Sequence, residues 1–189
     1  MAPYTQKSMA YFWLGDNEKA IEMLGKGLKS VRTDADRASI YNLRGDFYHT
    51  IGDTDRMYAD YDTTLMYAPD NINVLNNYAY YLAVEGRNLT RALEMSSKTL
   101  ESEPLNSTYL DTYAWILFKM EKYREALGYM EKALRYLESD NPEIYEHYGD
   151  VLYMCGETEK AIENWHKAVQ FNSTSPVLDR KIRERKYIE

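Results

Sequence analysis

The feature that most constrains this chain is a small residue that returns about every 35 positions. The first series is separated by 37, 34, 35 and 35 residues and consists of Ser8, Gly45, Ala79, Ala114 and Gly149. A second series, mostly of alanine, follows 12 or 13 residues after each of these: Ala20, Met57, Ala92, Ala126 and Ala161. Self-similarity at this period is typical of stacked structural repeats, in which each unit contacts its neighbours.

A glycine lies between the two series in four of the five repeats, at Gly15, Gly52, Gly86 and Gly156. Glycine adopts the positive φ that ends a helix, and an aspartate after the glycine can cap the next helix. Asp16 and Asp53 stand at that place in the first two repeats. With only nine glycines and five prolines in 189 residues, the pattern predicts helical hairpins.

Large apolar residues, glycine, tyrosine, alanine and proline recur in a fixed order within the repeats. The second repeat reads Tyr41, Gly45, Tyr48, Gly52, Tyr61, Leu65 and Pro69, and the fifth reads Tyr145, Tyr148, Gly149, Leu152, Gly156, Ala161, Trp165 and Ala168. This order resembles the tetratricopeptide repeat (TPR). The resemblance implies an all-α protein, an α-solenoid of hairpins that forms a right-handed superhelix with one concave surface. The chain departs from the pattern at Glu121, which replaces the turn glycine, and at Arg44, where an apolar residue is usual.

The repeat register predicts five TPR-like units and a C-terminal capping helix. The units span residues 1–34, 38–71, 72–106, 107–140 and 142–175, and the capping helix spans residues 176–189. Ser175 is predicted as its N-cap and Pro176 as its first helical residue. Leu178 and Ile182 lie four residues apart and are expected to cover the last hairpin. The basic residues of this helix are predicted to face water: Arg180, Lys181, Arg183 and Arg185.

No polar cap precedes the first unit, because sequence in repeat register begins almost at Met1. Terminal repeats normally need such a cap. We therefore expect a piece of a longer array, the alternative being a protein whose first helix is exposed. Self-association through the first hairpin is a further expectation, with Phe12, Trp13 and Leu14 as its apolar surface.

Composition and motifs exclude several classes of function. The net charge is −7 and no run of Lys and Arg occurs, which argues against nucleic acid and anionic membrane surfaces as partners. The apolar stretches are too short for membrane insertion, so a soluble chain is predicted. The sequence has no P-loop, dinucleotide fingerprint, HExxH, GxSxG or CxxC motif. We expect no enzyme activity, no cofactor and no metal site.

Single residues that could bind a metal, react or be modified have structural explanations. The three histidines, His49, His147 and His166, stand at different repeat positions and are predicted to be solvated or at the edge of the groove. Cys155 precedes a turn glycine and is predicted to pack rather than react. Three sequons begin at Asn88, Asn106 and Asn172, where we expect turn and cap residues.

The TPR resemblance implies which first-helix residues face the concave side. These candidate groove residues are Asn42, Asp46, Asn73, Asn76, Asn77, Tyr80, Asp111, Trp115, Phe118, Lys119, Glu146, Asp150 and Tyr153. His49, Glu143 and His147 fall on the same side, and Phe12 and Trp13 would line the first unit. Asparagine amides can hydrogen-bond the backbone of a bound peptide.

The candidate groove residues also predict the chemistry of the ligand. Trp115 and Tyr80 are interpreted either as apolar anchors for a ligand or as partial core packing between hairpins. Lys119 is the one cation among the predicted set, so a clamp for a terminal carboxylate is not expected. The acidic residues Asp46, Asp111, Glu146 and Asp150 favour a neutral or basic ligand.

Two functions remain open. The first is a non-catalytic scaffold that binds a peptide or helix of a protein partner in the concave groove. The second is a substrate-recruiting or regulatory region of a larger enzyme or envelope assembly complex, whose other domains lie upstream. Residues 75–127 resemble bacterial TPR proteins of poorly defined function, which implies an exported, periplasmic or lipoprotein parent, with a cytoplasmic protein as the alternative.

Overall fold

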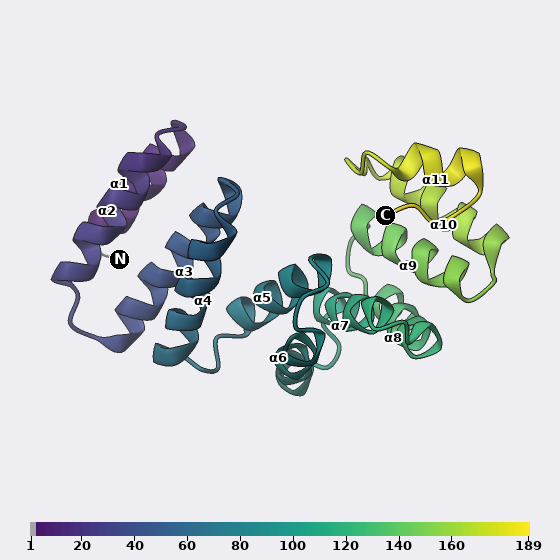
Figure 1. Ribbon diagram of the computed structural model, residues 1–189, viewed down its shortest axis with the longest axis horizontal. Coiled ribbons are helices and arrows are strands. Elements are labelled where there is room, and N and C mark those ends of the chain that lie inside the picture. The colour runs from purple at the N-terminus through teal and green to yellow at the C-terminus, as the bar shows by residue number, and fades with distance from the viewer. Residues whose placement is uncertain (1–2) are drawn as a thin grey trace. The chain divides into compact units, whose positions relative to one another are not determined.

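The computed structural model describes residues 3–189, which form eleven α-helices and no strand (Figure 1). The helices are α1 (Pro3–Trp13), α2 (Asn17–Ser30), α3 (Asp34–Thr50), α4 (Thr54–Tyr67), α5 (Ile72–Val84), α6 (Leu89–Ser102), α7 (Ser107–Lys119), α8 (Tyr123–Arg135), α9 (Pro142–Met154), α10 (Thr158–Gln170) and α11 (Leu178–Glu184). The first ten helices fall two to a predicted repeat, except that α3 begins at Asp34, before the second predicted range starts at residue 38. The all-α prediction is therefore confirmed for these residues.

The turns within the hairpins have the predicted backbone conformation. Gly15, Gly52, Gly86 and Gly156 have φ values of +79°, +77°, +65° and +87°. Asp16 and Asp53 accept hydrogen bonds from the backbone N–H groups of Lys19 and Arg56, which are the expected caps. Glu121 adopts the same left-handed conformation, with φ of +62°, although it is not glycine. That conformation costs a residue with a side chain about 1–2 kcal/mol, and packing of α7 against α8 outweighs it.

The small residues allow an aromatic ring of the second helix to lie directly against the first helix. A Cβ atom at Gly45 would lie 2.7 Å from the ring of Tyr61, and one at Gly149 would lie 2.5 Å from the ring of Trp165. In the first hairpin, the Oγ atom of Ser8 donates a 2.7 Å hydrogen bond to the carbonyl of Ala20. The two helices of a hairpin can thus approach closely because the residue of the first helix at this position is small.

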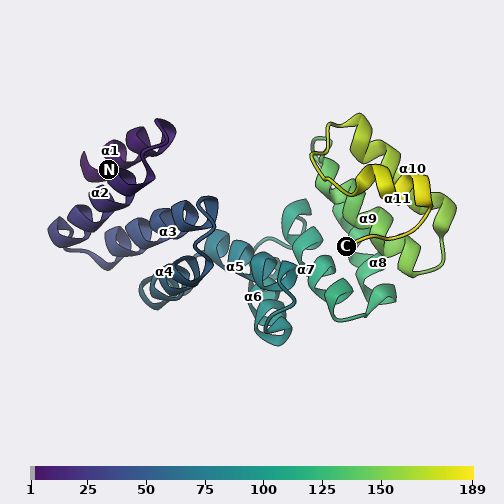
Figure 2. The same cartoon turned by 45° about the horizontal axis from the view of Figure 1, so that its top comes forward.

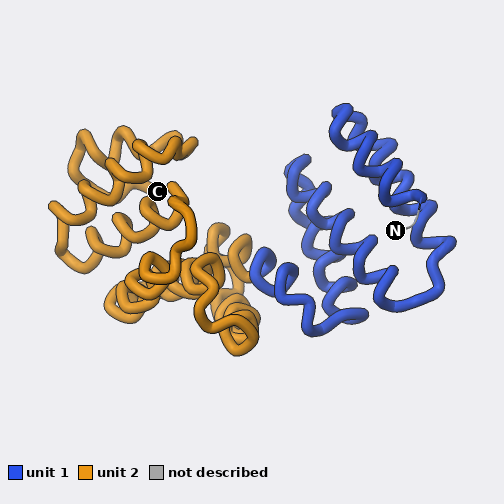
Figure 3. The backbone as a smooth tube through the Cα atoms, turned by 180° about the vertical axis from the view of Figure 1, so that it is seen from behind, with its two compact units in different colours: residues 1–78 blue, residues 79–189 orange. Residues whose placement is uncertain are grey.

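The chain divides into two compact units, residues 1–78 (unit 1) and residues 79–189 (unit 2), so the division falls inside α5 (Figure 3). In unit 1, a core cluster contains Ala20, Leu24, Ile40 and Phe47. In unit 2, the last hairpin and α11 share a cluster of Leu152, Ala161, Trp165, Ala168 and Leu178. Each unit therefore has its own buried apolar core.

Arg44, which departs from the apolar pattern, makes a bidentate ion pair within unit 1. Its Nε and Nη2 atoms donate to the two carboxylate oxygens of Asp60 at 2.6 and 2.7 Å. Asp60 is buried in α4, so the guanidinium compensates a carboxylate that would otherwise be desolvated without a partner. The departure at Arg44 and the acid at Asp60 are explained together.

Helix α11 covers the last hairpin and lies beside α10 (Figures 1 and 2). Leu178 is buried and Ile182 packs against the same cluster, as predicted. Three expectations are wrong. The helix begins at Leu178 instead of Pro176, and Ser175 donates its hydroxyl to Glu146 instead of capping the helix. Lys181 is 3% exposed and does not face water, because its ammonium pairs with buried carboxylates of α9.

The turn between α1 and α2 exposes apolar side chains. Trp13 and Leu14 are 79% and 81% exposed. Phe12 is half-buried and stacks on Phe47 with a centroid distance of 4.0 Å, so it contributes less free surface than predicted. Self-association through this hairpin stays a prediction. None of the described helices is long and apolar enough to span a membrane.

Alanine substitutions at two helical glycines, Gly149 and Gly128, test whether the close approach of the Trp165 ring to α9 requires a glycine. We expect Gly149→Ala to lower the free energy of unfolding by about 2 kcal/mol, because the new methyl group overlaps Trp165 and the carbonyl of Ala161. Gly128→Ala is the matched control in α8, where a Cβ meets no atom within 4 Å, and it should raise stability by up to about 1 kcal/mol. Urea unfolding measures both, and equal effects would contradict a requirement for close approach at Gly149.

Candidate functional site

The first helices of the three hairpins α5/α6, α7/α8 and α9/α10 line an open pocket of about 690 Å³ within unit 2. Its wall includes the predicted groove residues Tyr80 from α5, Trp115 from α7, and Glu146 and Asp150 from α9. Residues 172–177, which connect α10 to α11, and residues 187–189, which follow α11, complete the lining. Residues distant in sequence therefore meet at one site.

Tyr80 links the first and third of these helices. Its hydroxyl donates a hydrogen bond to the carboxylate of Glu143, and its ring centroid lies 6.2 Å from that of His147. Burial and the negative charge of Glu143 raise the pKa of Tyr80 far above its usual value. Tyr80 is thus a neutral hydrogen-bond donor whose side chain is partly accessible.

Trp115 forms part of the pocket wall and does not project as a free anchor. It is 8% exposed, and its ring stacks on Phe118 at 4.7 Å and on His147 at 4.1 Å. Of the two interpretations of Trp115, core packing describes its position. Its indole Nε1 atom is buried and finds no hydrogen-bond acceptor among residues 3–189. Such a buried donor is rare in native proteins and costs about 1–3 kcal/mol.

His147 pairs with Asp111 across α7 and α9. Its Nδ1 atom lies 3.0 Å from both carboxylate oxygens of Asp111, and both side chains are buried. His147 is therefore not solvated, although it lines the pocket. Burial alone would lower the pKa of His147, but the Asp111 carboxylate outweighs burial and raises the pKa to about 9. The imidazole is consequently a cation near neutral pH.

Lys181 from α11 is held by two carboxylates of α9. Its Nζ atom donates to Glu146 Oε1 at 2.8 Å and to Asp150 Oδ2 at 2.7 Å. Asp150 also accepts the indole N–H of Trp165 at 2.9 Å. Burial raises the pKa of Asp150 to about 6, although Lys181 acts in the opposite direction. Both carboxylates are therefore engaged by the chain itself.

The last three residues, Tyr187, Ile188 and Glu189, form a tail that contacts two predicted groove residues. Arg185, with φ of +53°, ends α11 and redirects the chain. The ring of Tyr187 meets Phe118 edge to face at 5.4 Å, and Glu189 pairs with Lys119. The tail also lines the pocket described above.

The other predicted groove residues do not line this pocket. Asn42 and Asp46 lie on α3 in unit 1, where Asp46 accepts the hydroxyl of Tyr61 at 2.6 Å. Three asparagines occupy the part of α5 that belongs to unit 1: Asn73, Asn76 and Asn77. Asn76 is buried. Tyr153 packs near Trp165, at a centroid distance of 6.0 Å, in the core of the last hairpin.

Sequence reasoning missed the contributions of Lys181, Tyr187 and Glu189. A signal for Lys181 was present, because it lies three residues after Leu178 and so shares the face that covers the last hairpin. Glu146 and Asp150 are four residues apart on one face of α9, and such a like-charged pair favours a cation nearby. The tail carries no comparable signal, because Arg185 is not a residue type that marks a left-handed helix end.

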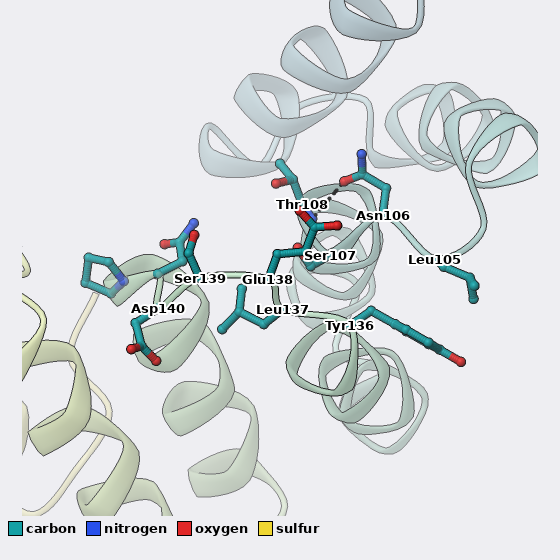
Figure 4. Close-up of a pocket in the computed structure, with 11 residues that line it drawn as sticks. Leu105, Asn106, Ser107, Thr108, Tyr136, Leu137, Glu138, Ser139 and Asp140 are labelled. Atoms are coloured by element: carbon teal, nitrogen blue, oxygen red, sulfur yellow. Dashed lines mark hydrogen bonds between the residues drawn. The ribbon is translucent and has the colours of Figure 1, made fainter.

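A second pocket, of about 540 Å³, lies between the α6–α7 and α8–α9 loops (Figure 4). Asn106 and Asn141 accept backbone N–H groups at the starts of α7 and α9, as expected for a cap at Asn106. Glu138 and Asp140 also line it, so it is not suited to anions. Within residues 3–189, no group of three or more His, Cys, Asp and Glu side chains is arranged to hold a metal ion.

The Asp111–His147 pair predicts a pH dependence of stability. Because the pKa of His147 is raised from 6.5 to about 9 in the folded protein, its contribution is complete below about pH 6.5 and is lost as the pH rises through 9. We expect the free energy of unfolding to fall by about 3 kcal/mol over this range. The double variant Asp111→Asn/His147→Gln should lose this slope in urea titrations, and parallel pH profiles would contradict the pairing.

Comparisons with known proteins identify the repeat family. The tetratricopeptide repeat model matches residues 4–172. A TPR repeat-containing protein of Methanocaldococcus jannaschii is 26% identical over 192 residues, which cover 85% of this chain and 33% of that protein. The chain therefore spans about a third of that relative's length.

Two solved structures share the fold. The type IV pilus biogenesis factor PilW has a TM-score of 0.80 at 18% identity, covering 96% of this chain and 84% of PilW. MamA from Desulfovibrio magneticus RS-1 has a TM-score of 0.74 at 16% identity, covering 94% of each chain. Together with the hairpins, the turn glycines and the match along residues 4–172, these likenesses show that the chain belongs to the tetratricopeptide repeat family.

Proposed function

We propose that this chain is a non-catalytic scaffold that binds an extended segment of a protein partner in the unit 2 pocket. The observation that carries the proposal is the convergence of Tyr80, Trp115 and His147, from three successive hairpins, on one open pocket. A fixed wall of this kind offers a partner apolar area without an ordering cost in the scaffold. TPR proteins act as interaction scaffolds, which supports the same function.

The pocket combines the two kinds of contact that a peptide segment needs. Trp115 contributes the small accessible part of its ring to the pocket wall, and the partly exposed ring of Tyr80 lies at the same wall. The polar side chains of Asn141 and Ser173 belong to the loops of the lining and can hydrogen-bond a backbone. Buried aromatic side chains of this type commonly dominate interface energies.

The charge preference of the ligand depends on which acidic residues are already engaged within the chain. Asp111 is paired with His147, and Glu146 and Asp150 with Lys181, so these carboxylates are not free to bind a basic ligand. Within the pocket, the neutral or basic preference then depends on Glu143, which accepts the hydroxyl of Tyr80. That preference stays a prediction.

Tyr80 is the residue whose removal tests the proposal best. Trp115→Ala is a poor test, because emptying its buried position would cost about 3–5 kcal/mol of stability. The probe is a set of random peptides of roughly 12 residues, selected by display on the immobilised full chain. We expect Tyr80→Ala to weaken selected peptides about tenfold, because an anchor ring of the pocket is lost.

The matched control is Tyr136→Ala, which removes an exposed ring after α8 that does not line this pocket. It should change affinity by less than about twofold. Fluorescence anisotropy with both variants, each checked for unchanged helicity, gives the comparison. Selected peptides that bind the Tyr80→Ala chain as tightly as the unchanged chain would overturn the assignment of the pocket.

A recruiting or regulatory region of a larger enzyme is a second candidate. The observation in its favour is that the matched region covers only 33% of the archaeal relative, so an array like this one occurs within a longer TPR protein. A parent sequence with a catalytic domain beside the repeats would support this candidate. A parent made only of further repeats would favour the independent scaffold.

A further inference from the structure

We propose, building on the scaffold function above, that the unit 2 pocket, together with Phe118 and Lys119, which the tail contacts beside it, selects a partner segment carrying an aromatic side chain two residues before a carboxylate. The tail occupies the same two seats when no partner is bound. The tail thus serves as an internal template for the ligand, because its side chains already satisfy the groups that the pocket presents.

The first seat holds an aromatic ring. Tyr187 contacts Phe118 edge to face at 5.4 Å, an arrangement in which the positive ring edge meets the negative ring face. The Nζ atom of Lys181 also lies 5.4 Å from the centroid of the Tyr187 ring, within cation–π distance. Lys181 is fixed by Glu146 and Asp150, so this ammonium is already positioned before any ring arrives.

The second seat holds a carboxylate. Lys119, whose side chain is 14% exposed, pairs with Glu189, and its Nζ atom lies 6.0 Å from the ring of Trp115. Its partner Glu189 is 73% exposed at the side chain. The Lys119 ammonium is largely buried and therefore needs a counter-charge, whereas the exposed Glu189 carboxylate is solvated without one. If Glu189 is removed, another acidic group is therefore favoured beside Lys119.

Most acidic side chains around the pocket are already paired within the chain, so they attract a basic ligand less than the sequence suggested. Beside the pocket, Lys119 provides a positive charge that can attract an acidic ligand. Asp111 with His147, and Glu146 and Asp150 with Lys181, are internally compensated. Lys119 is the cation of this region whose partner lies on the tail. Lys119 therefore sets where the carboxylate of the ligand binds. Phe118 and Lys181 set where its aromatic ring binds.

The contacts that hold the tail suit an exchangeable occupant. They are side-chain contacts, namely the ring of Tyr187 on Phe118 and Lys181 and the ion pair of Glu189 with Lys119. The Glu189 side chain is 73% exposed, and solvent on that side weakens its ion pair with Lys119. A tethered segment nevertheless competes at an effective concentration on the order of millimolar, so a partner needs further contacts along the pocket.

The test uses the full chain and a chain that ends at Lys186, which lacks only the tail. Keeping Lys186 preserves its backbone hydrogen bond to the carbonyl of Lys181 at 3.1 Å and therefore the end of α11. The probe is an acetylated and amidated peptide with the sequence of residues 185–189, so that the side-chain carboxylate alone supplies the acid. Binding is followed by the NMR shift of the Trp115 indole N–H, assigned with Trp115→Phe.

We expect the shortened chain to bind this peptide about tenfold more tightly than the full chain does, because no tail competes. Lys119→Gln in the shortened chain should weaken binding about fivefold, whereas Lys98→Gln, an exposed lysine on α6 outside the pocket, should leave it unchanged. Peptides with Tyr187→Ala or Glu189→Lys should bind at least about tenfold more weakly. Far-UV circular dichroism confirms that every chain keeps its helices.

The outcomes separate this inference from the function on which it rests. If the shortened chain prefers the Glu189→Lys peptide, the ligand class is overturned while the scaffold function stands. If full and shortened chains bind the peptide equally, the tail does not occupy the ligand seats and the inference fails. If neither this peptide nor the selected library peptides bind, both the inference and the proposed function fail.

Discussion

The ammonium of Lys181, buried between Glu146 and Asp150, is the interaction on which the C-terminal part of unit 2 depends. A helix of seven residues such as α11 is too short to be stable alone in water. Leu178 and this charge cluster fix it to the last hairpin. Because α11 is fixed, Arg185 can turn the chain so that Tyr187 reaches Phe118.

The same cluster changes the electrostatic character of the pocket. A chain with net charge −7 and several acids along its first helices suggests a basic ligand. Buried charges, however, are costly unless they are paired, so the acids nearest the core recruit cations from the chain itself. His147 and Lys181 serve this purpose by pairing with Asp111, Glu146 and Asp150. A count of charges on a face therefore does not give the charge available to a ligand.

The fold was predictable because its determinants are local. Gly156 and its equivalents end helices through backbone conformation, and Gly149 admits the ring of Trp165 through size alone. These features recur about every 35 residues, so the hairpins can be located in the sequence without knowing which distant residues are in contact. Even Glu121 adopts the turn conformation, because the packing of its hairpin outweighs the local cost.

The site was predictable only in part, because its contacts join residues far apart in sequence. Tyr80 and Trp115 line the pocket as the repeat positions imply. Asp46 and Tyr153 occupy similar repeat positions but contact Tyr61 and the Trp165 core instead. Which neighbour a first-helix side chain meets depends on the packing of that particular hairpin. The tail depends in addition on a left-handed Arg185, for which the sequence carries no marker.

The role of the buried cluster is tested most directly by the free energy of unfolding of Lys181→Met, compared with Arg180→Met on the exposed face of α11. We expect a loss of about 3–5 kcal/mol for Lys181→Met, because two buried carboxylates lose their cation. The triple variant that adds Glu146→Gln and Asp150→Asn should recover most of this loss, whereas Arg180→Met should cost less than about 1 kcal/mol. Equal and small losses for Lys181→Met and Arg180→Met would contradict the central role of the buried cluster.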